Sequence, residues 1–270
     1  RITHGRTSLI VDAAPPPSAH ASANAHASTL ALELTSGRRP LIVNCGSGAT
    51  FGQKWRRAGR ATPSHSTLGI EGYSSSRLGK SAGENAEEYL IDTPTDVRYE
   101  RTEVEGGTRL VVGHDGYVAS HGLTHLRTLH LSFDGRSLRG EDALVAMSAQ
   151  DRRRFDLSFD KSKLRGIPFL IHFHLHPEVD PRVDMQGNAV SLALKSGEIW
   201  IFRAVNVTDI KMDGSVFLEK SRLSPRATKQ IVLSGRAIEY ATRVSWSLSK
   251  AQDTPTAIRD YGSEDVLATE

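Results

Sequence analysis

The feature that most constrains this chain is a succession of short apolar and alternating segments, separated by turn signals, which fills most of its length. Glycine-containing pairs typical of tight turns recur between the segments: Gly106-Gly107, Asp134-Gly135, Ser196-Gly197, Asp213-Gly214 and Ser234-Gly235. The segments predict strands at Val97–Val104, Thr108–Asp115, Leu123–Phe133, Ser137–Val145, Arg153–Phe159, Phe169–His176, Ala189–Lys195, Glu198–Ala204, Val216–Leu223, Thr228–Ser234 and Arg243–Leu248. Sustained helical periodicity is almost absent, so the sequence predicts an all-β fold, a large antiparallel β-sandwich with few or no helices.

Composition and charge narrow the possible partners. The chain has 270 residues, of which 38% are apolar, enough for one large sheet domain over residues 1–270. No apolar run approaches the roughly 20 residues of a membrane span, so we expect no membrane partner. The net charge of +3 suits an anionic substrate but does not indicate nucleic acid. The single cysteine, Cys45, forms no intrachain disulfide.

The chain starts at Arg1 with no methionine and no charged-then-apolar leader. We therefore expect no signal peptide within it, and expect the chain to be a piece of a longer protein. Its compartment is not indicated by this start.

The stretch from Ser22 to Gly48 predicts a hairpin of two strands. In Asn24–Leu34 the even-numbered positions share one strand face, because side chains alternate along a strand, and the leucines among them mark that face as buried. Ser36-Gly37 makes the turn, and Leu41–Cys45 forms the return strand. Asn24 and His26, at the polar start of this hairpin, are therefore expected at the edge of the core or of a cleft.

Polar residues gather at the starts and ends of these strands. His26 lies two positions after Asn24, and His65 opens a later segment with a polar start. Imidazole serves as acid, base or metal ligand near neutral pH, but a histidine at a strand start is also often a satisfied polar residue. Asn44 and its neighbour Cys45 are expected to point to opposite faces of the return strand.

A second histidine pattern occurs in Phe169–His176, which alternates along its whole length. Its apolar residues face the core, so His172, His174 and His176 share the opposite face. Histidines at i and i+2 on a strand can chelate one metal ion. A polar sheet face turned to solvent or to a second domain explains the pattern equally well.

The segment Leu123–Phe133 carries an arginine on an otherwise apolar face. Arg127 shares this face with His125, so both are either buried partners or point into a cleft. Here the guanidinium could bind a carboxylate or sulfate through two hydrogen bonds. A structural ion pair with one of the chain's carboxylates is the other interpretation.

The order of three segments resembles a known family. AHASTLALEL, RPLIVNCGSG and WRRAGRATPSHSTLGIEG follow one another as in the C-terminal part of the heparinase II/III-like proteins. In that family a His-x-His-Ala-Asp-like segment opens a strand, and an Asp-x-Gly return strand follows. An arginine-containing loop then precedes an Ala-His-Asn-Thr-like segment. The later HLRTLHLSFDGRSLRGED and FHLHPEV also resemble its sheet domain, so the similarity covers nearly the whole chain.

The resemblance implies a bacterial polysaccharide lyase. In this family an N-terminal α/α toroid precedes the sandwich, and the cleft between them cleaves acidic polysaccharides, such as glycosaminoglycans, by β-elimination. The expected partners are therefore an acidic, uronate-containing polysaccharide and a toroid of the same protein. Because this chain has no helical run of that kind, the resemblance implies half an enzyme, inactive alone, and it suggests a periplasmic location.

The resemblance also assigns roles residue by residue. Asn24 and His26 match the family's His-x-His, and we expect them at the catalytic position, with Arg56 and Arg127 binding the acidic substrate. His26, Asn44 and His65 match positions that bind a structural zinc ion in some members.

Two departures from the family pattern matter. Asn24 stands where the family has a catalytic histidine and cannot act as a base. Neutral Asn44 replaces an aspartate and is a poor zinc ligand, with Cys45 beside it as the other candidate. The alternative function is a carbohydrate-binding or structural β-domain with no catalytic role. A third is a metal enzyme built on His172, His174 and His176.

Overall fold

The computed structural model describes residues 1–79, 88–184, 187 and 189–253. Its strands are β1 (Ile2–His4), β2 (Thr7–Val11), β3 (Leu32–Ser36), β4 (Arg39–Val43), β5 (Leu68–Ile70), β6 (Arg77–Leu78), β7 (Leu90–Ile91), β8 (Val97–Val104), β9 (Gly107–Tyr117), β10 (Leu123–Ser132), β11 (Ser137–Val145), β12 (Ile167–Leu175), β13 (Val179–Asp184), β14 (Ala189–Leu194), β15 (Ile199–Val205), β16 (Asp209–Phe217), β17 (Arg226–Ala237) and β18 (Ala241–Gln252). Its helices are α1 (Gln53–Arg60), α2 (Val118–His121) and α3 (Ala149–Lys161), with short 3₁₀ turns η1 (Ala19–Ser22), η2 (Ala49–Phe51) and η3 (Thr62–Ser64).

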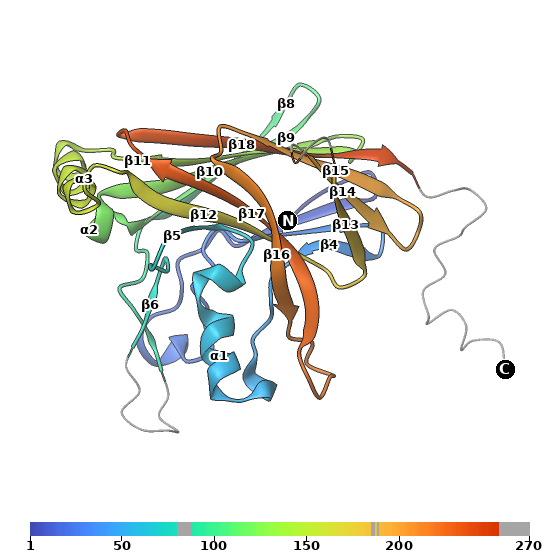
Figure 1. The fold of residues 1–270 in the computed structure, drawn as a ribbon, viewed down its shortest axis with the longest axis horizontal. Helices are drawn as coiled ribbons and strands as arrows, with labels where there is room; N and C mark the ends of the chain where they lie inside the picture. Colours follow the sequence, from blue (N-terminus) through green and yellow to red (C-terminus); the bar gives the residue numbers. More distant parts are fainter. Residues whose placement is uncertain (80–87, 185–186, 188, 254–270) are drawn as a thin grey trace.

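Two large antiparallel sheets make up the molecule. The first has the strand order β1-β2-β3-β4-β12-β17-β16, with β5 also paired to β12. The second has the order β13-β14-β15-β18-β11-β10-β9-β8 and lies across the first (Figure 1). The predicted all-β, antiparallel sandwich is confirmed.

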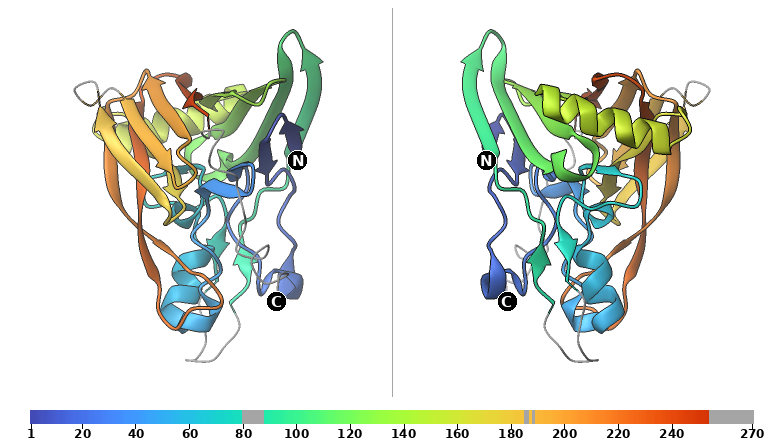
Figure 2. Two further views of the ribbon diagram at one scale, coloured as in Figure 1. Left: turned by 90° about the vertical axis from the view of Figure 1, so that its right-hand side faces the viewer. Right: turned by 90° about the vertical axis from the view of Figure 1, so that its left-hand side faces the viewer.

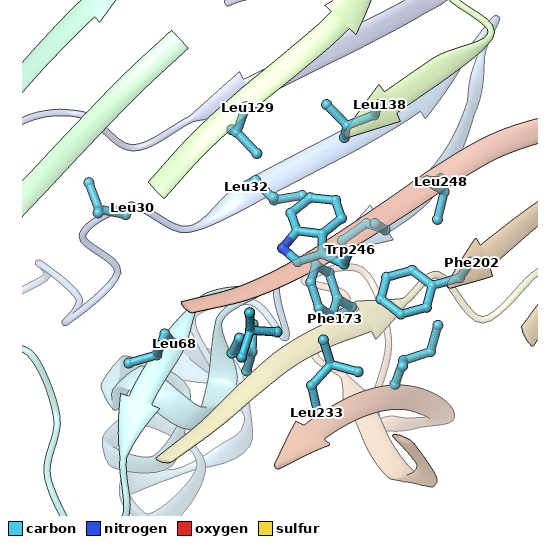
Figure 3. Packing of buried hydrophobic residues seen from close by; sticks show 14 of the residues in the cluster. Leu30, Leu32, Leu68, Leu129, Leu138, Phe173, Phe202, Leu233, Trp246 and Leu248 are labelled. Atoms are coloured by element: carbon cyan, nitrogen blue, oxygen red, sulfur yellow. The ribbon is translucent and has the colours of Figure 1, made fainter. Parts of the chain in front are cut away.

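The core forms between the two sheets, where strands present alternate side chains inward. In β10 every second residue is buried, as the period of two requires. At the centre the Phe173 ring meets the Trp246 ring edge-on at 4.8 Å and lies 5.0 Å from the Phe202 ring (Figure 3). Gly140 pairs with Trp246 across β11 and β18, and a Cβ there would lie 2.1 Å from the indole. The Trp246 indole therefore occupies the space that a side chain at position 140 would fill.

Several local predictions are wrong. The predicted strand Arg153–Phe159 is part of helix α3, which begins with a capping box between Ser148 and Asp151 and buries Phe155 at helical spacing. The pairs Asp213-Gly214 and Ser234-Gly235, expected as turns, lie within β16 and β17. The predicted strand Val216–Leu223 overlaps only the last two residues of β16, which ends at Phe217.

The strand predicted over Asn24–Leu34 begins only at Leu32. Leu30 has a φ of 64°, in the left-handed region, and such a residue cannot continue a strand. Asn24, His26 and Ser28 therefore belong to a loop.

The loops that follow η1 and β4 lie on the side of the first sheet away from the second, together with α1 and the small β6–β7 sheet (Figures 1 and 2). The histidines singled out above, His26 and His65, are carried by these loops. In the ranges that the structure describes, no helix is long and apolar enough to cross a bilayer.

Candidate functional site

His26 and His65 lie in direct contact, although 39 positions separate them. His26 belongs to the loop before β3, and His65 follows η3. His26 Nδ1 and His65 Nε2 are 2.9 Å apart. His65 Nδ1 lies 2.9 Å from the Ala61 carbonyl, which can only accept, so Nδ1 carries the proton and Nε2 of a neutral His65 accepts from His26. In a neutral His26 these bonds make Nε2 the ring nitrogen without a proton; the Gly59 carbonyl raises the pKa of this ring, against the larger effect of burial.

Burial keeps both imidazoles neutral. Desolvation, with a smaller contribution from His26, lowers the pKa of His65 to about 3. Desolvation, and next the guanidinium of Arg60, lowers the pKa of His26 from its ordinary value. At neutral pH His26 is therefore in its basic form, able to accept a proton.

Asn44, which follows β4, links the segment after His65 to β3. Its side-chain oxygen accepts from the backbone N–H of Ser66 (2.8 Å), and its amide nitrogen donates to Glu33 Oε1 (2.9 Å). Asn44, Glu33, His26, His65 and Asp12 line a cavity of about 340 Å³. The sequence alone did not single out Glu33 or Asp12, which come into the site through the pairing of β2, β3 and β4.

Arginines of α1 hold the loop that precedes His26. Arg56 donates to the Ala23 carbonyl (2.9 Å) and to Asn24 Oδ1 (3.1 Å), so the predicted site residues Asn24 and Arg56 are in contact. Arg60 is 1% exposed and donates to the carbonyls of Ser22 and Ala25, each at 2.7 Å. Arg60 was missed as a site residue because the sequence shows only a basic segment, not which of its side chains turns inward.

Arg127 is far from any surface. Its side chain is fully buried and donates to both carboxylate oxygens of Asp142, at 2.7 and 3.1 Å. The ion-pair interpretation is therefore confirmed, and this burial leaves Arg127 no surface to offer a substrate. Its Nη1 donates to the Leu30 and Ser66 carbonyls (2.8 and 3.0 Å), so it fastens the two segments that carry His26 and His65.

The carboxylate of Asp142 is the centre of this buried cluster. It also accepts from Trp246 Nε1 (2.9 Å) and lies 2.8 Å from His125 Nε2. Burial alone would raise the pKa of Asp142, but Arg127 and His125 outweigh it and hold that pKa below its usual range. Asp142 is therefore ionised, and the cluster is a structural pair inside the core.

The residues predicted to bind zinc do not provide a complete set of ligand atoms. Two histidine nitrogens converge, but both side-chain atoms of Asn44 are already bonded to protein groups. Cys45 points the other way and contacts His174 and Ser215. In the described ranges no three His, Cys, Asp or Glu side chains are grouped to hold a metal ion. These residues do not fit a closed four-ligand zinc site.

His172 and His174 of β12, and His176 just after it, contact separate partners. His174 Nε2 donates to the Pro63 carbonyl (2.9 Å), and its Nδ1 accepts from Ser215 (2.7 Å). His172 contacts Gln230, and His176 packs against Phe217. His172 and His174 are buried rather than turned to solvent, and their rings stack 5.8 Å apart without converging on one point. This arrangement does not support the third candidate, a metal enzyme on this strand.

Comparison with known proteins decides the family. A family model described as "Heparinase II/III-like, C-terminal" matches residues 1–247. The chain belongs to this family. The heparinase II/III-like domain is 29% identical over 250 residues to "FtsZ-localized protein C" of Caulobacter vibrioides, covering 92% of the chain and 41% of that protein.

Solved structures agree on the fold of the heparinase II/III-like domain. The heparan sulfate lyase HepC of Pedobacter heparinus matches with a TM-score of 0.65 at 14% identity, over 93% of this chain and 34% of the lyase. A heparinase III matches with a TM-score of 0.60 at 15% identity, over 90% of this chain and 33% of that protein. The chain thus spans less than half the length of each of these relatives, and the predicted family and β-sandwich are confirmed.

Proposed function

We propose that this chain is the C-terminal sheet domain of a lyase that cleaves an acidic, uronate-containing polysaccharide by β-elimination, and that it is inactive without a helical partner domain. The reaction needs a base for the C5 proton, a cation or donor beside the uronate carboxylate, and an acid for the leaving oxygen. The chain supplies candidates for the first two. We assign the third to the helical domain, as the family resemblance suggests.

The observation that carries the proposal is the bond between His26 and His65. Because the Nδ1–H of His26 donates a hydrogen bond to a neutral His65, its Nε2 is the atom left to accept a proton. Its lowered pKa keeps that atom unprotonated at neutral pH. This arrangement supports His26 as the general base, in place of the histidine that the family has at Asn24.

Arg56 supports the second role. Its Nη2 donates to the Ala23 carbonyl and to Asn24 Oδ1, and within the described part of the chain its other N–H groups are left to bind a carboxylate. Asn24 can donate a hydrogen bond to substrate from its amide nitrogen but cannot take a proton. Together they would position the uronate and offset charge that develops on its carboxylate.

The test compares the 270-residue chain with the same chain joined to its helical domain. Both are incubated with uronate polymers, and absorbance of the unsaturated product is followed. We expect product only with the longer protein. Turnover by the 270-residue chain would refute the requirement for a second domain.

A non-catalytic binding or structural domain is the second candidate, and two observations favour it. Asn24 replaces the family's catalytic histidine, and the relative with 29% identity is named for its localisation with FtsZ. In that case the longer protein would bind acidic polysaccharide without forming unsaturated product. Substitution of His26 would then change only stability.

A further inference from the structure

A second cavity is lined by residues of α1 and of the segment 72–78, which runs into β6. Figure 1 shows α1 and β6 on the same side of the first sheet. The cavity has a volume of about 600 Å³ and is lined by Lys54, Arg57, Tyr73, Ser76 and Arg77, with small residues between them. None of these residues belongs to the cavity beside His26 and His65. The two cavities are therefore distinct.

The wall of this cavity is rich in cations. Arg57 pairs with Glu88, and Arg77 pairs with Asp92 at 2.7 Å, yet the side chains of these arginines stay 51% and 62% exposed. Lys54 makes no ion pair within the described part of the chain and remains exposed. Among the described residues, three cations thus line one hollow and two carboxylates pair with them, which leaves capacity for an anion.

An aromatic ring stands at the same hollow. Tyr73 is 52% exposed, and its ring is held at 90° against the His121 ring, with centroids 4.6 Å apart. A fixed, half-exposed tyrosine offers an apolar ring face together with a polar tip. Such a surface suits a flat, hydroxyl-bearing ring better than a free inorganic anion.

A buried hydroxyl gives an independent sign of a ligand. Ser76 lines the cavity and is 1% exposed, but its Oγ has no hydrogen-bond partner among the described residues. A buried polar atom without a partner is costly and uncommon in folded proteins. The Oγ atom is closed off from the cavity in this conformation, so a ligand hydroxyl would satisfy it after a rotation of the Ser76 side chain towards the cavity.

We propose that this cavity binds an anionic sugar unit, with the acidic group at Lys54 and Arg77, the ring on Tyr73 and a hydroxyl at Ser76. The inference deepens the proposed function and rests on it for the choice of an acidic sugar. It assigns a second contact with the same polymer, away from the proposed base. The shared chemistry is an anionic pyranose, bearing either a carboxylate or a sulfate group.

The test is calorimetric titration of the 270-residue chain with three hexasaccharides: hyaluronan, which carries carboxylates only, heparin, which adds sulfates, and neutral chitohexaose. We expect one or both acidic hexasaccharides to bind and chitohexaose not to bind. Tyr73→Ala and the double change Lys54→Gln with Arg77→Gln should each weaken binding at least tenfold. Thermal melts establish that each variant is folded.

Arg101→Gln is the matched control, because it removes an exposed cation from β8, outside the cavity, and should leave affinity unchanged. Equal affinity of the cavity variants and the control would overturn the proposal, as would an absence of binding to either acidic hexasaccharide. Unsaturated product from the longer protein tests the proposed lyase activity separately. The site can therefore fail while the lyase proposal stands, and the reverse.

Discussion

His26 Nδ1 and His65 Nε2 share one hydrogen bond of 2.9 Å, and this contact fixes the tautomers of both rings. The proton on His65 Nδ1 is held by the Ala61 carbonyl, so the direction of the shared bond follows. The same two nitrogens can share a proton or bind one metal ion, but not both at once. A metal ion bound to this pair would place the His26 proton on Nε2, the proposed base, so metal binding and basicity compete at this site.

Acid should destabilise the domain through His65. Its folded-state pKa of about 3 lies below the ordinary value of 6.5, so stability is full above pH 6.5 and falls as the pH drops towards 3. At pH 5 the loss from this one group is about 2 kcal/mol. Urea unfolding at pH 7 and pH 5 measures it, and His65→Gln should reduce the difference by about this amount, because other buried histidines such as His174 also have lowered pKa values and remain. The exposed His20 offers a matched control, since His20→Gln should leave the difference intact.

The buried pair Arg127–Asp142 should matter far more than a surface pair. Arg127→Met leaves an ionised carboxylate in the core, and breaking such a pair costs about 3–5 kcal/mol. The exposed pair Arg182–Asp180 is the comparison, where Arg182→Met should cost no more than about 1 kcal/mol. Denaturant midpoints measure both. Equal losses of stability in the two variants would show that the Arg127–Asp142 pair does not stabilise the core as described above.

Position 140 should tolerate only glycine, because the core has no room for a side chain there. Gly140→Ala places a Cβ 2.1 Å from the Trp246 ring, and such overpacking typically costs about 1–3 kcal/mol. At Gly214, on β16, a Cβ would meet nothing within 4 Å. Gly214→Ala should therefore be close to neutral in thermal melts. A Gly140→Ala protein as stable as the parent would contradict the packing described here.

Zinc content should depend on residue 44. With Asn44 already bonded to Glu33 and Ser66, we expect less than one zinc ion per chain after dialysis, by elemental analysis. Asn44→Asp places a second carboxylate beside Glu33, and the repulsion should be relieved by a cation, so zinc content and zinc-dependent melting temperature should rise. Asn44→Ser should do neither. Stoichiometric zinc in the unsubstituted protein would instead support the original zinc prediction.

Much of the fold could be predicted from sequence because sheet alternation is a local signal. The buried residues of β10 and β12 follow their apolar pattern directly. Helix α3 was missed because its apolar residues, read over a short window, are compatible with either period. The true start of β3 depends on one residue, Leu30, in a left-handed conformation, which composition does not reveal.

The candidate site was predictable only in part. His26, Asn44 and His65 were expected together and do line one cavity, with Asn24 and Arg56 in contact beside it. The sequence left Arg127 either as a substrate-binding residue or as part of a structural ion pair. Alternation along a strand shows which face a side chain shares, but not whether a carboxylate lies next to it. Asp142, on the neighbouring strand β11, decided it through pairing that only the folded sheet provides.

The central claim is that His26, oriented by His65, removes a proton during β-elimination. The most direct measurement is the initial rate of unsaturated product formation on uronate polymers by the longer protein, with and without His26→Ala. We predict that the change lowers the rate at least a hundredfold, as expected for loss of a general base, while the melting temperature shows a folded protein. His20→Ala, at an exposed histidine, should leave the rate unchanged. An undiminished rate in a folded His26→Ala protein, or no product from the unsubstituted protein, would contradict the claim.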